Sequence, residues 1–154
     1  MLALVTEATT ETADASKRPG ELTDRIGYLL KHAQLRFQEI QRHALTPLSL
    51  DGRLLAVLIT AEQAGPCQQL RLAEKLGVDR TTMVDLVDRL EASGFVQRHA
   101  DPDDRRARLI HVTTRGRKAL TAGIAASDDV DQRFLAALSD ADQRAFRRAL
   151  SRLA

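Results

Sequence analysis

Arginine is the chemically most distinctive residue type in this chain of 154 residues. Only four of its 23 basic residues are lysines, and the others are arginines, whose planar guanidinium groups suit bidentate contact with phosphate or guanine. Three of these arginines, Arg105, Arg106 and Arg108, lie in the polar stretch 101–108. The same stretch also carries three aspartates. Such a stretch is either a solvated loop whose charges cancel or a contact for a nucleic-acid backbone.

Hydroxyl and charged side chains gather on one face of the stretch 80–93, whose apolar residues recur at helical spacing. This polar face carries Thr81, Thr82, Asp85, Asp88 and Arg89. Hydroxyls in the first turn of a helix reach phosphates or base edges, and Arg80 and Arg89 are suited to phosphate or guanine. Asp85 needs either a cytosine amino group or a neighbouring arginine such as Arg89, so the sequence leaves its role open.

The sequence lacks the motifs of common enzymes and of metal or disulfide sites. There is no glycine-rich phosphate loop, no nucleophile elbow and no His-Glu-x-x-His motif, so the sequence does not predict an enzyme. The single cysteine, Cys67, rules out an intramolecular disulfide and a cysteine-based zinc site, and we expect a buried, inert thiol rather than a redox sensor. His43, His99 and His111 lack metal-ligand spacing, so we expect no metal and no other cofactor.

Apolar periodicity places the polar groups on a mainly helical framework. An apolar stripe from Ile26 to Ala44 predicts one long first helix, which Pro47 ends. Asp51 is a suitable N-cap for a second helix that ends near Gly65.

Two short helices follow, at residues 68–76 and 80–93, joined by Gly-Val-Asp. Asp79 can cap the second of them, and its outer face is polar. This is the pattern of a helix-turn-helix unit.

Strand-forming residues at 95–99 and 108–112 flank the arginine-containing loop and predict a β-hairpin. Thr113 or Thr114 then caps another long helix, and Ser139 caps a last one with an apolar stripe. The first twenty residues, rich in Thr, Ala, Glu and Ser, are interpreted as a mobile tail.

The sequence LAEKLGVDRTTMVDLVDRLE, which starts at Leu72, resembles the helix-turn-helix of MarR-type transcription regulators. DPDDRRA at 101–107, followed by LIHVT, resembles their wing and its exit strand. The resemblance extends over about residues 21–154. It implies a mainly α fold with a small β-hairpin wing and a helical dimerisation domain formed by the N- and C-terminal helices.

On this basis residues 21–154 form a single subunit. Its winged helix-turn-helix lobe spans 51–119, and its dimerisation helices span 21–46 and 120–154. The resemblance implies an obligate homodimer on a pseudo-palindromic operator in double-stranded DNA. Each lobe would place its second helix in the major groove and its wing along the minor groove. Such proteins usually repress transcription until a small ligand releases them.

The family's minor-groove arginine corresponds to Arg106, and we expect Asp104 to orient its guanidinium by a charge-assisted hydrogen bond. Arg105 and Arg108 would contact phosphates, and Asp79 occupies a family position tied to DNA binding while also capping its helix. The predicted DNA-binding residues are Asp79, Arg80, Thr81, Thr82, Arg89, Asp104, Arg105, Arg106 and Arg108.

The family's ligand pocket suggests a small aromatic or phenolic effector. Tyr28 and His32, one helical turn apart, could line that pocket, although satisfied residues at the edge of the core are the more common outcome of this spacing. No apolar run is long enough to span a membrane and no secretory signal is recognised, so we expect a cytoplasmic protein. The alternative function is a winged-helix module that binds proteins and not DNA.

Overall fold

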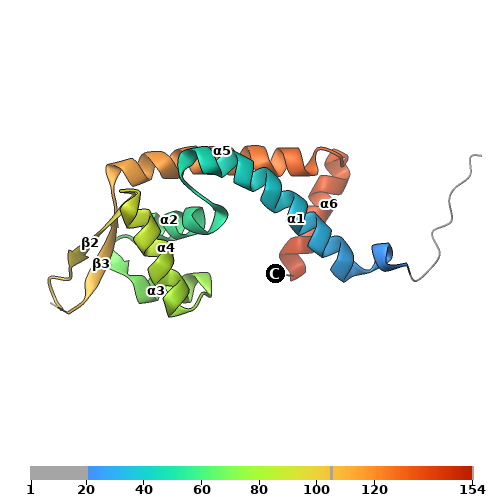
Figure 1. Ribbon diagram of the computed structural model, residues 1–154. Helices are drawn as coiled ribbons and strands as arrows, with labels where there is room; N and C mark the ends of the chain where they lie inside the picture. Colours follow the sequence, from blue (N-terminus) through green and yellow to red (C-terminus); the bar gives the residue numbers. More distant parts are fainter. Residues whose placement is uncertain (1–20, 105, 154) are drawn as a thin grey trace, which may run out of the picture. The chain divides into compact units, whose positions relative to one another are not determined.

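The computed structural model describes residues 21–104 and 106–153. The predicted tail, 1–20, and Arg105 of the predicted wing lie outside the described residues. The fold class is confirmed, because helices dominate and the β2-β3 hairpin of a small antiparallel sheet follows the helix-turn-helix (Figure 1). The elements are η1 (Leu22–Asp24), α1 (Ile26–Leu45), η2 (Thr46–Leu48), α2 (Gly52–Ala64), β1 (Cys67–Gln68), α3 (Gln69–Leu76), α4 (Arg80–Ala92), β2 (Val96–Ala100), β3 (Arg108–Val112), α5 (Thr114–Leu135) and α6 (Asp140–Leu153).

The chain divides into two compact units, residues 1–33 and residues 34–154. In the described part of the first unit, large apolar side chains are more than half exposed: Leu22, Ile26, Leu29 and Leu30. The second unit contains the hydrophobic core.

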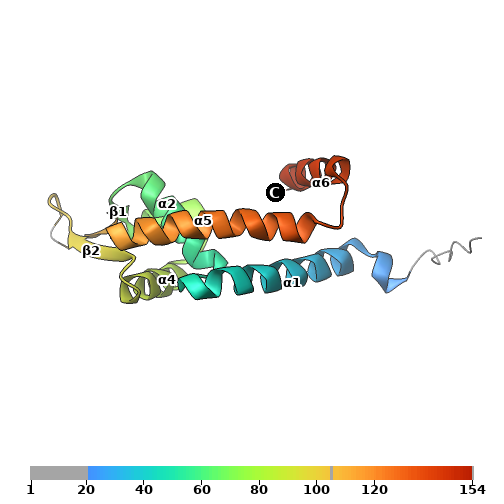
Figure 2. The ribbon, with the colours of Figure 1, turned by 90° about the horizontal axis from the view of Figure 1, so that it is seen from above.

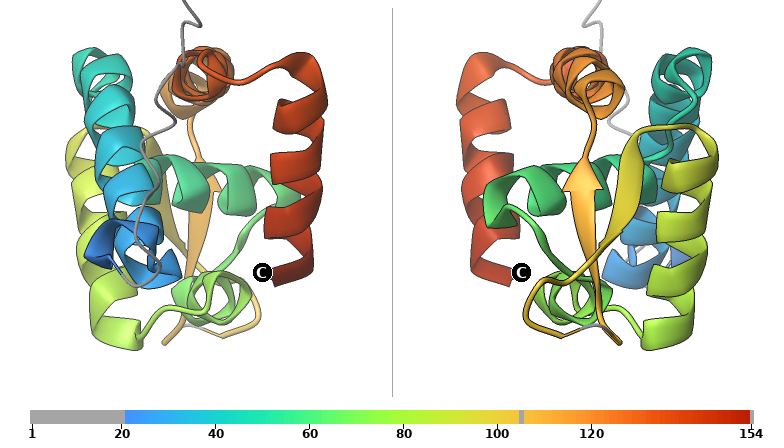
Figure 3. Two further views of the ribbon diagram at one scale, coloured as in Figure 1. Left: turned by 90° about the vertical axis from the view of Figure 1, so that its right-hand side faces the viewer. Right: turned by 90° about the vertical axis from the view of Figure 1, so that its left-hand side faces the viewer.

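The core lies in the lobe formed by α2, α3, α4 and the sheet, together with the start of α5. Leu58, Leu72, Leu90 and Val96 are completely buried there. Helix α2 contacts α3, α4 and α5 and therefore forms the centre of this lobe (Figure 3). The predicted apolar faces of these helices are the faces that pack inward, which fixes the direction of their polar faces.

The predicted helix caps are confirmed. Asp51, Asp79 and Thr113 each accept a hydrogen bond at 2.9 Å from the backbone N–H three residues ahead. Ser139 accepts the corresponding bond at 3.2 Å. Each cap satisfies a backbone donor that the first turn of a helix leaves unpaired.

Gly77 ends α3 in the left-handed region, with φ at 63°. The N–H of Val78 donates to the carbonyl of Ala73 at 3.1 Å, which closes the end of the helix. A side chain at Gly77 would strain this backbone. The turn therefore fixes the angle between the two helices of the helix-turn-helix.

The sheet has three antiparallel strands in the order β1-β3-β2. Strands β2 and β3 form the predicted hairpin, with β2 one residue further along the chain than predicted. Strand β1 was not predicted, since two residues are too few to show an alternating pattern. It pairs Cys67 with Ile110 and thereby attaches the start of α3 to the hairpin.

Helix α6 packs beside the last turns of α5 (Figure 2). The Phe134 ring lies 6.4 Å from Phe146 and 5.4 Å from Phe37, measured between ring centroids. Arg147 donates to Asp131 at 2.9 Å. No residue of α6 is buried, however, and Leu153 is 83% exposed.

Within the described ranges no single helix is long and apolar enough to cross a membrane. By length and composition alone, one bent pair meets that test: residues 26–48 together with α2.

Candidate nucleic-acid interface

The polar face of α4 projects away from the core of the lobe. Met83, Leu86 and Leu90 point inward, whereas Thr81 and Asp85 on the opposite side are exposed. The helix therefore presents hydroxyl and charged groups along a solvent-facing ridge, and a ridge of this kind fits the major groove of DNA.

Asp79 fixes the first turn of α4. Its carboxylate accepts the Thr82 backbone N–H at 2.9 Å and the Thr82 hydroxyl at 2.6 Å. These hydrogen bonds lower the pKa of the Asp79 carboxyl below its usual value. Asp79 is thus ionised at neutral pH and acts as a cap. The Thr82 hydroxyl therefore donates its hydrogen bond to Asp79, whereas the Thr81 side chain is exposed.

The tip of the hairpin is shaped by aspartates. Asp101 accepts the N–H of Asp103 at 3.0 Å, and Asp104 accepts the N–H of Arg106 at 2.9 Å. The expected bond from Asp104 to the Arg106 guanidinium is corrected here, because the contact is to the backbone of Arg106. Asp104 therefore sets where the chain carries Arg106 and leaves the guanidinium exposed.

Arg98 on β2 connects the hairpin to α4, and sequence reasoning missed it. Its guanidinium binds Asp88 at 2.6 Å and also pairs with Glu91, while its backbone N–H donates to Glu91 at 3.0 Å. Partial burial alone would lower the pKa of Arg98, but the two carboxylates outweigh it and raise that pKa. The available signal was the pair of acids on α4, three residues apart in the sequence, to which a cation on a neighbouring element could bind.

A groove of about 400 Å³ lies between the start of α3, the start of α4 and the hairpin. Its walls carry four arginines and one acid, and are formed by Gln68, Gln69, Leu70, Arg80, Arg98, Asp104, Arg106, Ala107 and Arg108. Of the predicted residues it brings together Arg80, Asp104, Arg106 and Arg108, which come from two separate segments of the sequence. Gln68 and Gln69 were not predicted, since β1, which positions them, gives no sequence pattern.

Arg89 lies on a different side of α4 from this groove. It donates to Asp51 at 2.7 Å and so joins α4 to the N-cap of α2. The pairing with Asp85 considered in the sequence is not formed. More than half of the Arg89 side chain remains exposed, at 56%.

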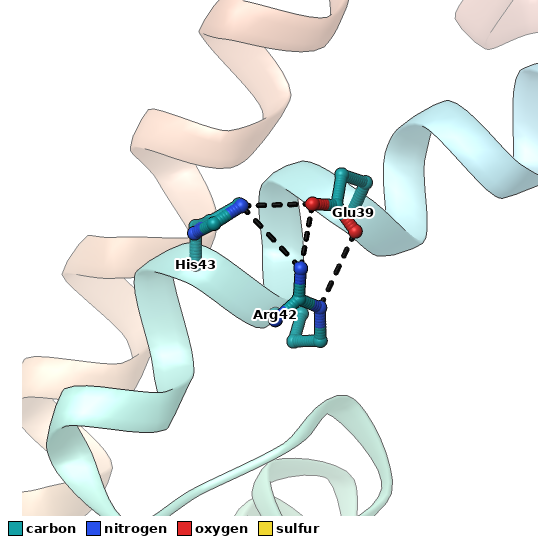
Figure 4. A network of polar contacts seen from close by, with 3 residues as sticks. All are labelled: Glu39, Arg42 and His43. Atoms are coloured by element: carbon teal, nitrogen blue, oxygen red, sulfur yellow. Dashed lines mark hydrogen bonds and ion pairs between the residues drawn. The ribbon is translucent and has the colours of Figure 1, made fainter.

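A smaller cavity of about 250 Å³ lies between the end of α1 and the start of α2. It is lined by Gln38, Gln41, Arg42, Thr46, Leu50, Asp51 and Gly52. Arg42 is held by Glu39 at 2.6 Å, and His43 lies 2.8 Å from the same carboxylate (Figure 4). Arg42 and, to a smaller extent, His43 lower the pKa of Glu39. The Arg42 side chain, which lines the cavity, is therefore restrained by Glu39.

The predicted effector residues Tyr28 and His32 lie in the first unit. Their ring centroids are 4.1 Å apart and the rings are tilted by 38°. Tyr28 is half-buried and His32 is exposed. The two rings form one small aromatic surface on α1.

Cys67 is buried, as expected, and burial raises the pKa of its thiol, which disfavours the reactive thiolate. In the part of the chain that the structure describes, no three His, Cys, Asp or Glu side chains form a group able to hold a metal ion.

Comparison with known proteins places this arrangement in a family. Residues 53–107 match the model of the MarR family. A transcriptional regulatory protein for the hcr operon of Thauera aromatica is 31% identical over 135 residues, which is 87% of this chain and 81% of that protein.

Solved structures agree with this match. A transcriptional regulator from Pseudomonas aeruginosa is 34% identical, with a TM-score of 0.78 over 87% of this chain and 100% of that one. The repressor CouR, solved on a 23-mer DNA duplex, is 31% identical with a TM-score of 0.77, over 87% and 95% of the two chains. CouR from Rhodococcus jostii is also solved with p-coumaroyl-CoA, at 34% identity and a TM-score of 0.71, over 87% of this chain and 94% of CouR.

The chain belongs to the MarR family. It is a DNA-binding transcription regulator and not an enzyme, as the sequence predicted. Its fold, a winged helix-turn-helix lobe with additional helices from both ends of the sequence, is the fold of these neighbours.

Proposed function

We propose that this chain is a homodimeric repressor that binds a pseudo-palindromic operator and leaves it when a small aromatic or phenolic ligand binds. The groove lined by four arginines between α4 and the hairpin carries this proposal. A concave surface rich in guanidinium groups beside an exposed helix face suits a duplex, whose backbone is anionic and whose major groove admits a helix.

In this proposal α4 enters the major groove and the hairpin follows the minor groove. Thr81 and Thr82 lie at the entering end of α4, while Arg80 and Arg108 contact phosphates from the groove walls. Arg106 enters the minor groove, where a narrow width strengthens the negative potential that attracts a guanidinium. Arg105 is assigned a phosphate contact from its place in the sequence.

Two further residues act through position. Asp79 and Asp104 hold the first turn of α4 and the hairpin tip by backbone hydrogen bonds. Arg89 uses one nitrogen for Asp51 and keeps other N–H donors and most of its surface for a phosphate.

The dimer would be formed by residues 21–46 and 120–154. The exposed leucines and isoleucines in these segments support this assignment, among them Ile26, Leu30, Ile124, Leu150 and Leu153. An apolar face left uncovered within one subunit is buried most simply by the same face of a second copy. The helices of 21–46 and 120–154 thus position two lobes for two half-sites of DNA.

The effector proposal rests on two observations. Tyr28 and His32 form an aromatic surface on α1, and the relative CouR is solved with p-coumaroyl-CoA, whose acyl group is phenolic. We also infer a cytoplasmic location, where a bacterial operator lies. Titrating p-coumaroyl-CoA and free p-coumarate into the DNA complex tests for a phenolic effector. Release by either compound supports the proposal, and unchanged binding with both contradicts it.

DNA binding is tested by selecting bound fragments from random duplexes and then measuring Arg106→Ala on the selected DNA. We expect a twofold-symmetric consensus and a loss of affinity of about 10-fold or more in the variant, because a charged hydrogen-bonding group is removed from the minor groove. Thermal unfolding should stay nearly unchanged, since the side chain is exposed.

Lys118→Ala is the matched control, because it removes one positive charge from an exposed position on α5, outside the groove. Its affinity should remain within about 2-fold of the parent. Equal weakening in both variants would assign the effect to net charge. A parent protein that binds no duplex in dilute buffer would overturn the function.

A further inference from the structure

Helix α4 carries three acidic side chains after its cap, on the element that would face DNA: Asp85, Asp88 and Glu91. Asp88 and Glu91 both pair with Arg98, whose single positive charge offsets one of their two negative charges. An acid that faces a phosphate backbone without a partner repels it, so this pairing reduces the repulsion that Asp88 and Glu91 would otherwise cause. Asp85 is different.

Asp85 has no ion pair or hydrogen bond to its side chain among the residues that the structure describes, and it is exposed. The sequence offered Arg89, four residues on, as its partner. Arg89 instead donates to Asp51 at 2.7 Å on another helix. Of the two roles left open for Asp85, the ion pair with Arg89 is therefore not formed in this structure.

Asp85 also has a central place on the DNA-facing ridge. It follows Thr81 by four residues, which puts the two side chains one above the other on a single face of the helix. Met83 and Leu86, which lie between and beside these two residues in the sequence, are buried and so fix the orientation of this part of α4. A duplex that meets Thr81 in its major groove therefore meets Asp85 one turn further along α4.

A carboxylate accepts hydrogen bonds and donates none, which restricts the base edges it can face. Guanine presents two acceptors in the major groove, and thymine presents an acceptor and a methyl group. Adenine places an acceptor beside its amino donor. Cytosine presents an amino donor alone on its own edge, so it is the base whose edge best matches a carboxylate.

We propose that Asp85 is a specificity-determining residue that selects a cytosine once in each half-site, by accepting a hydrogen bond from its amino group. The proposal rests on the function proposed above, in which α4 enters the major groove. It explains why an unpaired acid is placed on a surface that otherwise attracts anions. The Asp85 carboxylate repels the phosphates of every DNA sequence. Only a sequence with cytosine at this position offsets that repulsion, by donating a hydrogen bond to the carboxylate.

Selection from random duplexes with the parent, Asp85→Asn and Asp85→Ala tests the proposal. The parent should prefer cytosine at one symmetric pair of positions by about 10-fold, the size expected for one base contact. Asp85→Asn should lose this preference at those positions, or transfer it to adenine, which an amide matches, and keep the rest of the consensus. Asp85→Ala should lose the preference without gaining another.

Glu74→Gln is the control, since it neutralises an exposed acid on the neighbouring helix α3. It should keep the complete parental consensus, cytosine included. An unchanged consensus in both Asp85 variants, with all sequences bound more tightly, would overturn the proposal and reduce Asp85 to a general electrostatic effect. A parent that yields no consensus would instead overturn the function proposed above, so the two failures are distinguishable.

Discussion

Leucine side chains differ in burial between the DNA-binding lobe and α6. Leu58 and Leu72 in the lobe are completely buried, whereas Leu150 and Leu153 in α6 are 41% and 83% exposed. The lobe completes its core within one chain. Helix α6 carries an apolar stripe that its own chain leaves largely uncovered. In the proposed homodimer, a second copy of the chain would cover this stripe. The comparison separates a region whose apolar side chains are buried within one subunit from a region whose apolar side chains are left exposed.

The largest effect is expected from the core of the lobe. Leu58→Ala should lower the free energy of unfolding by about 2–5 kcal/mol, because it removes buried methyl groups and leaves a cavity. Urea unfolding followed by circular dichroism measures this. Leu70→Ala makes the same chemical change at a site that is 52% exposed and should cost less than about 1 kcal/mol. Similar losses in the two variants would contradict the burial of the core.

The second effect concerns α6. Leu153→Asp should raise the dimer dissociation constant by about 10-fold or more, because a charge would have to be buried in the proposed interface. Sedimentation at several concentrations should then detect the 17.0 kDa subunit mass. The lobe should unfold as in the parent once dimerisation is accounted for.

Ser151→Asp, an acid added at another exposed position of α6, is the control for charge alone. It should leave the dissociation constant within a few-fold of the parent value. A parent that sediments as a single subunit at micromolar concentration would rule out the homodimer.

The smallest effect is electrostatic and lies inside the lobe. Partial burial alone would raise the pKa of Asp51, but the Leu54 N–H and Arg89 outweigh it, so its folded-state pKa is lowered from 3.8. A lowered folded pKa stabilises the protein above pH about 4, and this stabilisation is lost as the pH falls through the lowered value.

Asp51→Asn keeps an N-cap side chain and removes the charge. We expect a flatter dependence of stability on pH between about 2 and 5, by less than about 1 kcal/mol because the pair is partly exposed. Thermal unfolding across this pH range measures it, with Asp128→Asn, at an exposed position of α5, as control. An identical pH profile in parent and Asp51→Asn would show that the negative charge of Asp51 adds nothing to the stability of this cap.

Much of the lobe was predictable, because its signals are local. The caps Asp51, Asp79 and Thr113 each bind a backbone N–H only three residues ahead, so their spacing in the sequence suffices to find them. The hairpin was placed within one residue by strand-forming residues around a polar turn. The choice of Arg106 among the arginines of the hairpin came instead from the resemblance to the MarR family, and the structure places its side chain in an exposed position.

The partners of the charged residues were not predictable in this way. Arg89 has acids nearer in sequence than Asp51, 38 residues away, yet it binds Asp51. Arg98 has aspartates a few residues ahead in the loop and binds Asp88 and Glu91 on α4. Exposed ion pairs differ little in energy, so small differences in reach, set by the packing of whole elements, decide between candidates.

The sequence by itself determined the helices, their caps, the turn at Gly77 and the arginine-bearing hairpin, since these depend on contacts within a few residues. Only the tertiary structure decided which carboxylates are neutralised, that β1 joins the sheet, and that Asp85 stands unpaired beside Thr81. The physical reason is that burial and long-range pairing arise when α2, α4 and the sheet pack around one core. The spacing of residues within each element does not specify how the elements pack against one another.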